Sequence, residues 1–200
     1  MCTVLRVRWT ITPRFSPQPW IACSGCGTLK PFQSSGRIRL NANGKKLDAW
    51  LIYRCCDCGR TWNRPLFERR NVRDIDPCML DALHSNDPDW IRAQEFDIAS
   101  LRRRAQQITQ FTDVDVSRET IAGPEESAAC IEIVLRVPLP TDLRLDRLLT
   151  AELRLSRSRL HVLDAEGKLR IMPERKQALR REIRDGMRIV VEHLTVTPLK

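Results

Sequence analysis

Two cysteine pairs with the spacing of metal ligands are the residues of this 200-residue sequence best suited to chemistry. Each pair has the form Cys-x-x-Cys-Gly, the first at residues 23–27 and the second at residues 55–59. Thiolates at this spacing can surround one ion, and the glycine permits a tight turn that directs backbone N–H groups at sulfur. The sequence therefore predicts a four-thiolate zinc site with these ligands: Cys23, Cys26, Cys55 and Cys58.

Four thiolates fill the tetrahedral shell of zinc, so we expect the ion to be structural and not catalytic. Zinc release on oxidation, as in a redox sensor, stays open as a second use of the same thiols. Four further cysteines have no assigned role: Cys2, Cys56, Cys78 and Cys130. Of these, Cys56 is adjacent to Cys55 and is an alternative ligand.

Two disulfides are the alternative to a metal, and they require an oxidising compartment. The sequence starts without the apolar run of about 7–15 residues that a secretory signal needs. It also lacks an apolar stretch near the about 20 residues that cross a bilayer. We therefore expect a cytoplasmic protein with reduced thiols and no membrane partner.

The residues between the cysteine pairs have the pattern of a β-ribbon. Residues 37–41 and 47–54 read as strands, and Asn43-Gly44 between them is a strong hairpin turn signal. The fold expected for residues 1–75 is therefore a zinc ribbon.

Only 42% of the residues are apolar, which favours two small units over one large core. The chain after residue 75 is expected to hold two further segments. Apolar spacing around Leu83, and from Trp90 to Ile108, predicts an acidic helical spacer over residues 76–126. After the turn signal at Gly123-Pro124 we expect a third segment, residues 127–200. The expected fold class is α+β, with an N-terminal four-cysteine ribbon, a helical middle and a C-terminal two-helix domain with a small sheet.

Charge is distributed unevenly along the chain. The net charge is +9, and basic residues predominate at both ends whereas acidic residues predominate over residues 79–140. Two basic ends suggest two surfaces for a polyanion, but for net charge alone an ordinary solvated surface is the favoured explanation.

Two short helices are expected between residues 144 and 166. Asp146 is placed to cap the first helix and Ser156 the second. With Ser156 as the cap, Arg157, Ser158 and Arg159 occupy the first turn, where backbone N–H groups and the helix dipole favour phosphate. This pattern predicts an anion site.

The same stretch resembles the RNA-binding domain named after ribosomal protein S-four. The matching residues are Arg144-Leu145-Asp146, Ser156-Arg157-Ser158, Gly167, and Gly186 with Ile189 and Val191. The chain departs from that pattern at Asp164 and at a charged insert over residues 174–181. The resemblance implies contacts with structured RNA through these side chains: Arg144, Arg147, Arg157, Ser158, Arg159, Lys168 and Arg170.

The run from Asn41 to Cys55, with Thr61-Trp62-Asn63 after the second pair, resembles the bacterial family called domain of unknown function 1062. That resemblance extends over most of the chain and implies no activity. No phosphate loop, activated nucleophile or carboxylate dyad is recognisable, so we expect neither an enzyme nor a small-molecule substrate.

The expected function is non-catalytic binding of structured RNA by a protein with structural zinc, with ribosomal and transfer RNA as the candidate ligands. A protein-interaction adaptor with the same zinc site is the first alternative. An RNA-modifying enzyme is the second, because related RNA-binding domains often accompany such enzymes.

Overall fold

The computed structural model describes residues 4–124 and 129–192. It divides the chain into two compact units, one of residues 1–14 with 111–200, and the other of residues 15–110. Each unit contains one five-stranded sheet. We call them the discontinuous unit and the cysteine unit.

The cysteine unit has an antiparallel sheet in the order β5-β4-β3-β2-β6. Its strands are β2 (Gln18–Ala22), β3 (Leu29–Asn43), β4 (Lys46–Cys55), β5 (Thr61–Asn71) and β6 (Gln107–Thr109). The helices are η1 (Val72–Asp74), α1 (Pro77–Ser85), α2 (Pro88–Glu95) and α3 (Ile98–Arg102). The three α-helices start at Asp76, Asp87 and Asp97, whose side chains accept hydrogen bonds from backbone N–H groups of the first turn.

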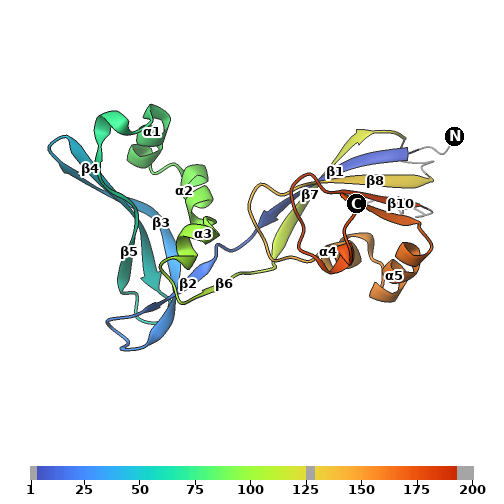
Figure 1. Ribbon diagram of the computed structural model, residues 1–200, viewed down its shortest axis with the longest axis horizontal. Helices are drawn as coiled ribbons and strands as arrows, with labels where there is room; N and C mark the ends of the chain where they lie inside the picture. The colour runs from blue at the N-terminus through green and yellow to red at the C-terminus, as the bar shows by residue number, and fades with distance from the viewer. Residues whose placement is uncertain (1–3, 125–128, 193–200) are drawn as a thin grey trace. The chain divides into compact units, whose positions relative to one another are not determined.

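Helices α1 to α3 lie along one face of this sheet (Figure 1). Alternate residues of β4 face the core, so Leu51 and Tyr53 are buried and pack with Leu83, Ile91 and Leu101 of the helices. The helices are therefore the second layer of the cysteine unit, because the apolar face of its sheet needs a cover.

The discontinuous unit has a mixed sheet in the order β7-β1-β8-β10-β9. Its strands are β1 (Val4–Pro13), β7 (Val114–Ala122), β8 (Cys130–Arg136), β9 (Leu169–Met172) and β10 (Arg188–Glu192). Its helices are α4 (Leu145–Leu153), α5 (Arg157–Ala165) and η2 (Ala178–Arg180).

One face of this second sheet forms the core of the discontinuous unit. Trp9, Ile133 and Ile189 are completely buried there with Leu149 of α4 and Leu160 of α5. The other face is polar, with ion pairs such as Arg6–Glu132. Alternation along the strands thus gives a two-layer unit with one solvated sheet face.

The expected fold class is wrong in its helical middle and in its C-terminal domain. Strands hold 44% of the residues and helices 25%, so the protein is mainly β. The expected spacer is not a separate helical segment, because α1 to α3 pack on the ribbon sheet, and β6 and β7 follow where more helix was expected.

The C-terminal helices do not form a domain of their own either. They cover a sheet whose strands β1 and β7 come from outside residues 127–200. β1 pairs in parallel with β8, and Val7 lies opposite Ile133. The sequence boundary expected at residue 126 lies outside the described residues. Among the described residues, no helix combines the length and apolar character needed to cross a bilayer.

Candidate metal centre

The two cysteine turns connect neighbouring strands at the same end of the sheet. The first, residues 23–27, joins β2 to β3, and the second, residues 55–59, joins β4 to β5. The β3–β4 hairpin turns at Gly44-Lys45, one residue later than the expected Asn43-Gly44, because Asn43 still pairs with Lys46 across the strands. The same register places Phe32 opposite Cys55. A hydrogen bond from Cys56 N to Pro31 O, 3.0 Å long, holds the second turn beside the strand that follows the first.

Both turns have the same backbone hydrogen bonds. In the first, Gly27 N donates to Cys23 O at 2.8 Å, and Cys23 N donates to Thr28 O at 2.9 Å. In the second, Gly59 N donates to Cys55 O at 3.0 Å, and Cys55 N donates to Arg60 O at 2.8 Å. Gly27 and Gly59 have φ of 70° and 73°, a conformation that a residue with a Cβ rarely adopts. The second turn is therefore a structural repeat of the first.

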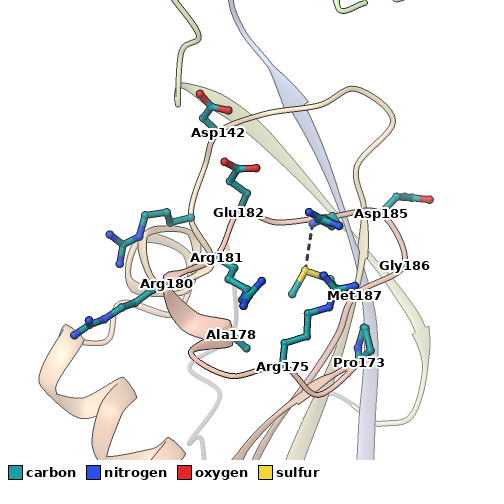
Figure 2. Close-up of a pocket in the computed structure, with 12 residues that line it drawn as sticks. Asp142, Pro173, Arg175, Ala178, Arg180, Arg181, Glu182, Asp185, Gly186 and Met187 are labelled. Carbon is teal, nitrogen blue, oxygen red and sulfur yellow. Dashed lines mark hydrogen bonds between the residues drawn. The ribbon is translucent and has the colours of Figure 1, made fainter. Parts of the chain in front are cut away.

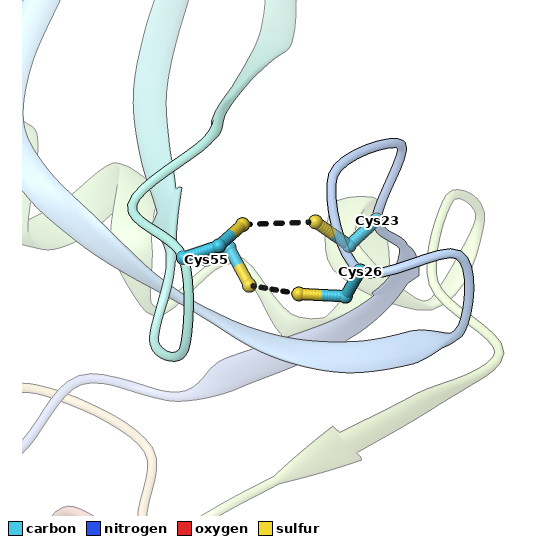
Figure 3. Close-up of side chains that lie close together, drawn as sticks. Cys23, Cys26 and Cys55 are labelled. Atoms are coloured by element: carbon cyan, nitrogen blue, oxygen red, sulfur yellow. Dashed lines mark hydrogen bonds between the residues drawn. The ribbon is translucent and has the colours of Figure 1, made fainter.

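The four sulfurs that these turns present lie within 4.8 Å of one another. Cys23 Sγ is 3.4 Å from Cys58 Sγ, and Cys26 Sγ is 3.9 Å from Cys55 Sγ (Figure 3). A tetrahedron with Zn–S bonds of about 2.3 Å has S–S edges of about 3.8 Å. The cluster, Cys23, Cys26, Cys55 and Cys58, can therefore hold one metal ion with little movement, and these are the four ligands expected from spacing.

The thiols of the cluster are not ionised alike. Burial would raise the pKa of Cys23, but hydrogen bonds from the Cys26 backbone, the Cys58 thiol and the Gly25 backbone lower that pKa to about 6. For Cys26, the hydrogen bond with Cys58 and then burial raise the pKa to about 12. The surrounding groups therefore stabilise the thiolate of Cys23 but oppose ionisation of Cys26. A cation between the sulfurs is needed for all four to be thiolates.

Side chains around the cluster fix its shape. A Cβ on Gly25 would lie 2.8 Å from Arg60 Cγ and 3.1 Å from Cys58 Sγ, so the first turn packs directly on the second. Lys30 forms an ion pair with Asp57, which raises the pKa of Lys30. Sequence reasoning missed these contacts, because each joins residues that are far apart in the sequence.

The extra cysteines stand apart from the cluster. Cys56 is exposed and its thiol is not among the four clustered sulfurs, which leaves Cys55 as the ligand. Cys78 is exposed, and Cys130 is buried at the start of β8 in the discontinuous unit. Cys2 lies outside the described residues.

A buried arginine ties the helices to the sheet of the cysteine unit. Arg64 is 1% exposed, and its Nη1 donates to Gln94 O at 2.8 Å and to the Tyr53 hydroxyl at 3.3 Å. Burial raises the pKa of Tyr53, while the charge of Arg64 opposes that rise. An arginine in a strand gives no sequence signal of burial, because its hydrogen-bond partners Tyr53 and Gln94 come from other elements, so this network too was not predictable.

The residues expected to contact RNA lie in the discontinuous unit, mostly around α4 and α5. Arg147 and Arg157 line one shallow depression, with Thr150 and Ala151 between them. Ser156 caps α5, as expected, by accepting a 3.1 Å hydrogen bond from Arg159 N. Arg147, Arg157, Ser158 and Arg159 are exposed, and among the described residues no ion pair engages these three arginines.

The other three residues expected to contact RNA, Arg144, Lys168 and Arg170, each form an ion pair within the protein. Arg144 is held by both oxygens of Asp146, at 3.1 and 2.7 Å, so Asp146 pairs with the residue at the N-cap and does not cap α4 itself. Lys168 pairs with Glu166 at 2.8 Å. Arg170 pairs with Glu192, and strand alternation puts it on the face of the sheet opposite α4 and α5.

Residues 40–175 match the family described as protein of unknown function (DUF1062). The chain belongs to this family. The match includes the second cysteine turn and helices α4 and α5, and it begins after the first turn. No curated protein matches the chain. A search of solved structures found no match either.

Proposed function

We propose that this DUF1062 protein binds structured RNA without catalysis and that its four-cysteine cluster holds a structural zinc ion. The two parts rest on different observations, so each can fail alone.

Zinc is supported by the donor set and the geometry of the cluster. Four thiolates in a tetrahedral arrangement select zinc or iron among common metals. Cys23 and Cys55 are each only 3% exposed, and four protein ligands leave no position for a water or substrate. The ion would cross-link the β2–β3 and β4–β5 connections and take no part in a reaction. Because the thiols must stay reduced, the proposal places the protein in the cytoplasm.

RNA binding is supported chiefly by the exposed arginines of α4 and α5. Arg147 and Arg157 border one depression, and Arg159 is in the first turn of α5, where the capped N-terminus already favours phosphate. Arginines without carboxylate partners can bind phosphate oxygens through two donors each. The resemblance of residues 144–146 and 156–158 to the S-four signature supports RNA over other polyanions.

Charge reversal tests the RNA-binding surface. Arg157→Glu with Arg159→Glu changes two exposed side chains, so the variant should fold normally and lose RNA binding. Arg188→Glu is the matched control, because Arg188 is an exposed arginine on the solvated sheet face of the same unit. Normal RNA binding by the double variant would exclude the α4–α5 surface. A partner captured from cell extract in spite of nuclease treatment would favour the protein-interaction adaptor.

Metal analysis of the purified protein tests the assignment of the four-cysteine cluster as a zinc site. The purified protein should contain one zinc per chain and should be colourless, because zinc has a filled d shell. A stoichiometric amount of iron with strong visible absorption would contradict the assignment to zinc. Absence of any bound metal from protein purified under reducing conditions would contradict the metal centre itself.

A further inference from the structure

A pocket of 540 Å³ in the discontinuous unit lies between the segment that joins β9 to β10 and the residues that precede α4. The two walls are joined by backbone hydrogen bonds, from Leu145 N to Arg181 O and from Ile183 N to Leu143 O, each 2.9 Å long. Leu179, Ile183 and Met187 anchor the β9–β10 segment in the core. The shape of the pocket is therefore set by the packed core on which its walls rest.

Arginines predominate in the pocket lining. The five are Arg144, Arg175, Arg180, Arg181 and Arg184. Figure 2 shows Arg175 and Arg181 directed toward the hollow, whereas Arg180 points away from it. Arg181 Nε donates to Lys176 O at 3.1 Å, which fixes the side chain and leaves its terminal nitrogens free to bind a ligand. Among the described residues, no ion pair neutralises Arg175, Arg181 or Arg184.

The rest of the lining is suited to a molecule larger than a bare anion. Pro173, Ala178 and Met187 give it an apolar surface. The carboxylates of Asp142 and Glu182 lie together at one end in Figure 2. Asp185 accepts a 2.8 Å hydrogen bond from Val137 N, which holds its carboxylate in the wall. With five arginines and three carboxylates, the lining keeps a net positive charge.

We propose that this pocket binds a nucleoside 5′-phosphate. Guanidinium groups bind phosphate through paired donors, the apolar surface accommodates a base, and the Glu182 carboxylate can accept hydrogen bonds from ribose hydroxyls or base amino groups. Inorganic phosphate would leave most of 540 Å³ unused, whereas small-molecule sites fall within about 300–1,000 Å³. Part of this lining comes from the charged insert, residues 174–181, that sets the chain apart from the S-four pattern.

The same chemical group has two sources, a free nucleotide and the 5′-terminal nucleotide of an RNA. The site is independent of the arginines on α5, so it goes beyond the RNA-binding surface proposed above. Its failure can be told apart from failure of that surface, because the residues to be changed are different.

Calorimetric titration of the full-length protein tests the pocket with AMP, and with a short RNA carrying either a 5′-phosphate or a 5′-hydroxyl. Arg175→Ala with Arg181→Ala should weaken binding of the phosphorylated ligand at least about tenfold, by loss of charge-assisted hydrogen bonds. Arg188→Ala, an exposed arginine on β10 outside the lining, should bind like the unchanged protein. Arg157→Glu with Arg159→Glu should also retain AMP binding.

Saturable binding of AMP identifies a free nucleotide as a ligand. Binding only of the 5′-phosphorylated RNA identifies an RNA end. Either result supports the pocket provided that the Arg175 and Arg181 changes weaken the binding at least about tenfold. The proposal is overturned if the Arg175 and Arg181 changes leave binding of the phosphorylated ligand unaltered. It is also overturned if the two RNA forms bind equally and AMP does not bind, or if none of the three ligands binds.

Discussion

Cys23 Sγ lies 3.4 Å from Cys58 Sγ although the two residues belong to different turns of the cysteine unit. A metal between them would therefore cross-link two strand connections and not merely close one loop. Each turn contributes one cysteine of the apolar core, Cys23 or Cys55, and one nearer the surface, since Cys26 is half-buried and Cys58 is exposed.

Chelation of the metal should destabilise the cysteine unit selectively. Metal binding to the folded state alone stabilises that state, and structural zinc in small peptides contributes about 10–16 kcal/mol. The loss should be smaller here, because the cysteine unit also has an apolar core. Hydrogen exchange should accelerate in residues 18–71 after chelation and stay unchanged in β8 and β10. Uniform acceleration in both units, or no change in either, would contradict this account.

The adjacent cysteines Cys55 and Cys56 should respond differently to replacement by serine. Cys55→Ser removes a ligand and should lower the metal content well below one ion per chain. Cys56→Ser should retain a full equivalent, because the exposed Cys56 thiol lies outside the cluster. Metal content per chain, measured on both variants in parallel, checks this. Equal loss in both variants would mean that Cys56 is also a ligand.

Gly25 should not tolerate a side chain. Gly25→Ala places a methyl group 2.8 Å from Arg60 Cγ and should destabilise the cysteine unit by about 1–3 kcal/mol, the usual range for overpacking. Part of this loss should disappear in combination with Arg60→Ala, and the rest should remain because Cys58 Sγ is also close. Denaturant unfolding of the single and double variants gives the coupling energy. Additive effects of the two changes would show that Gly25 and Arg60 do not meet.

Trp9 should matter to the discontinuous unit and not to the metal centre. It is 0% exposed in the core formed by β1, β8 and the C-terminal helices, so Trp9→Ala should destabilise that unit by about 3–5 kcal/mol. Metal content and exchange protection in β3 and β4 should not change. Loss of metal from this variant would favour the expectation, drawn from sequence, that residues 1–75 fold together.

Local features of this protein were predictable from the sequence. The Cys-x-x-Cys-Gly turns and the Ser156 cap each depend on a few adjacent residues, so their geometry is encoded where they occur. A hairpin at Gly44 was predictable in the same way, although its turn lies one residue later than Asn43-Gly44. The clustering of the four cysteines followed from the hairpin between them.

Pairings between distant segments were not predictable in the same way. The alternation of β1 identifies a strand but not its parallel partner β8, which follows more than a hundred residues later. Apolar spacing that continues to Ile108 predicts helix where the structure has β6. The alternation of Val114 and Val116 is short, and β7 is not predicted from it. The ion pair that engages Arg170 likewise depends on where its partner Glu192, on the neighbouring strand β10, lies in space.

The most direct test of the central claim measures binding of the zinc-loaded protein to an RNA hairpin and to duplex DNA of matched sequence across a salt series. We predict preference for RNA, affinity that falls as salt rises, and loss of binding in Arg157→Glu with Arg159→Glu but not in Arg188→Glu. Equal affinity for RNA and DNA, or full RNA affinity in the double variant, would contradict the proposed function.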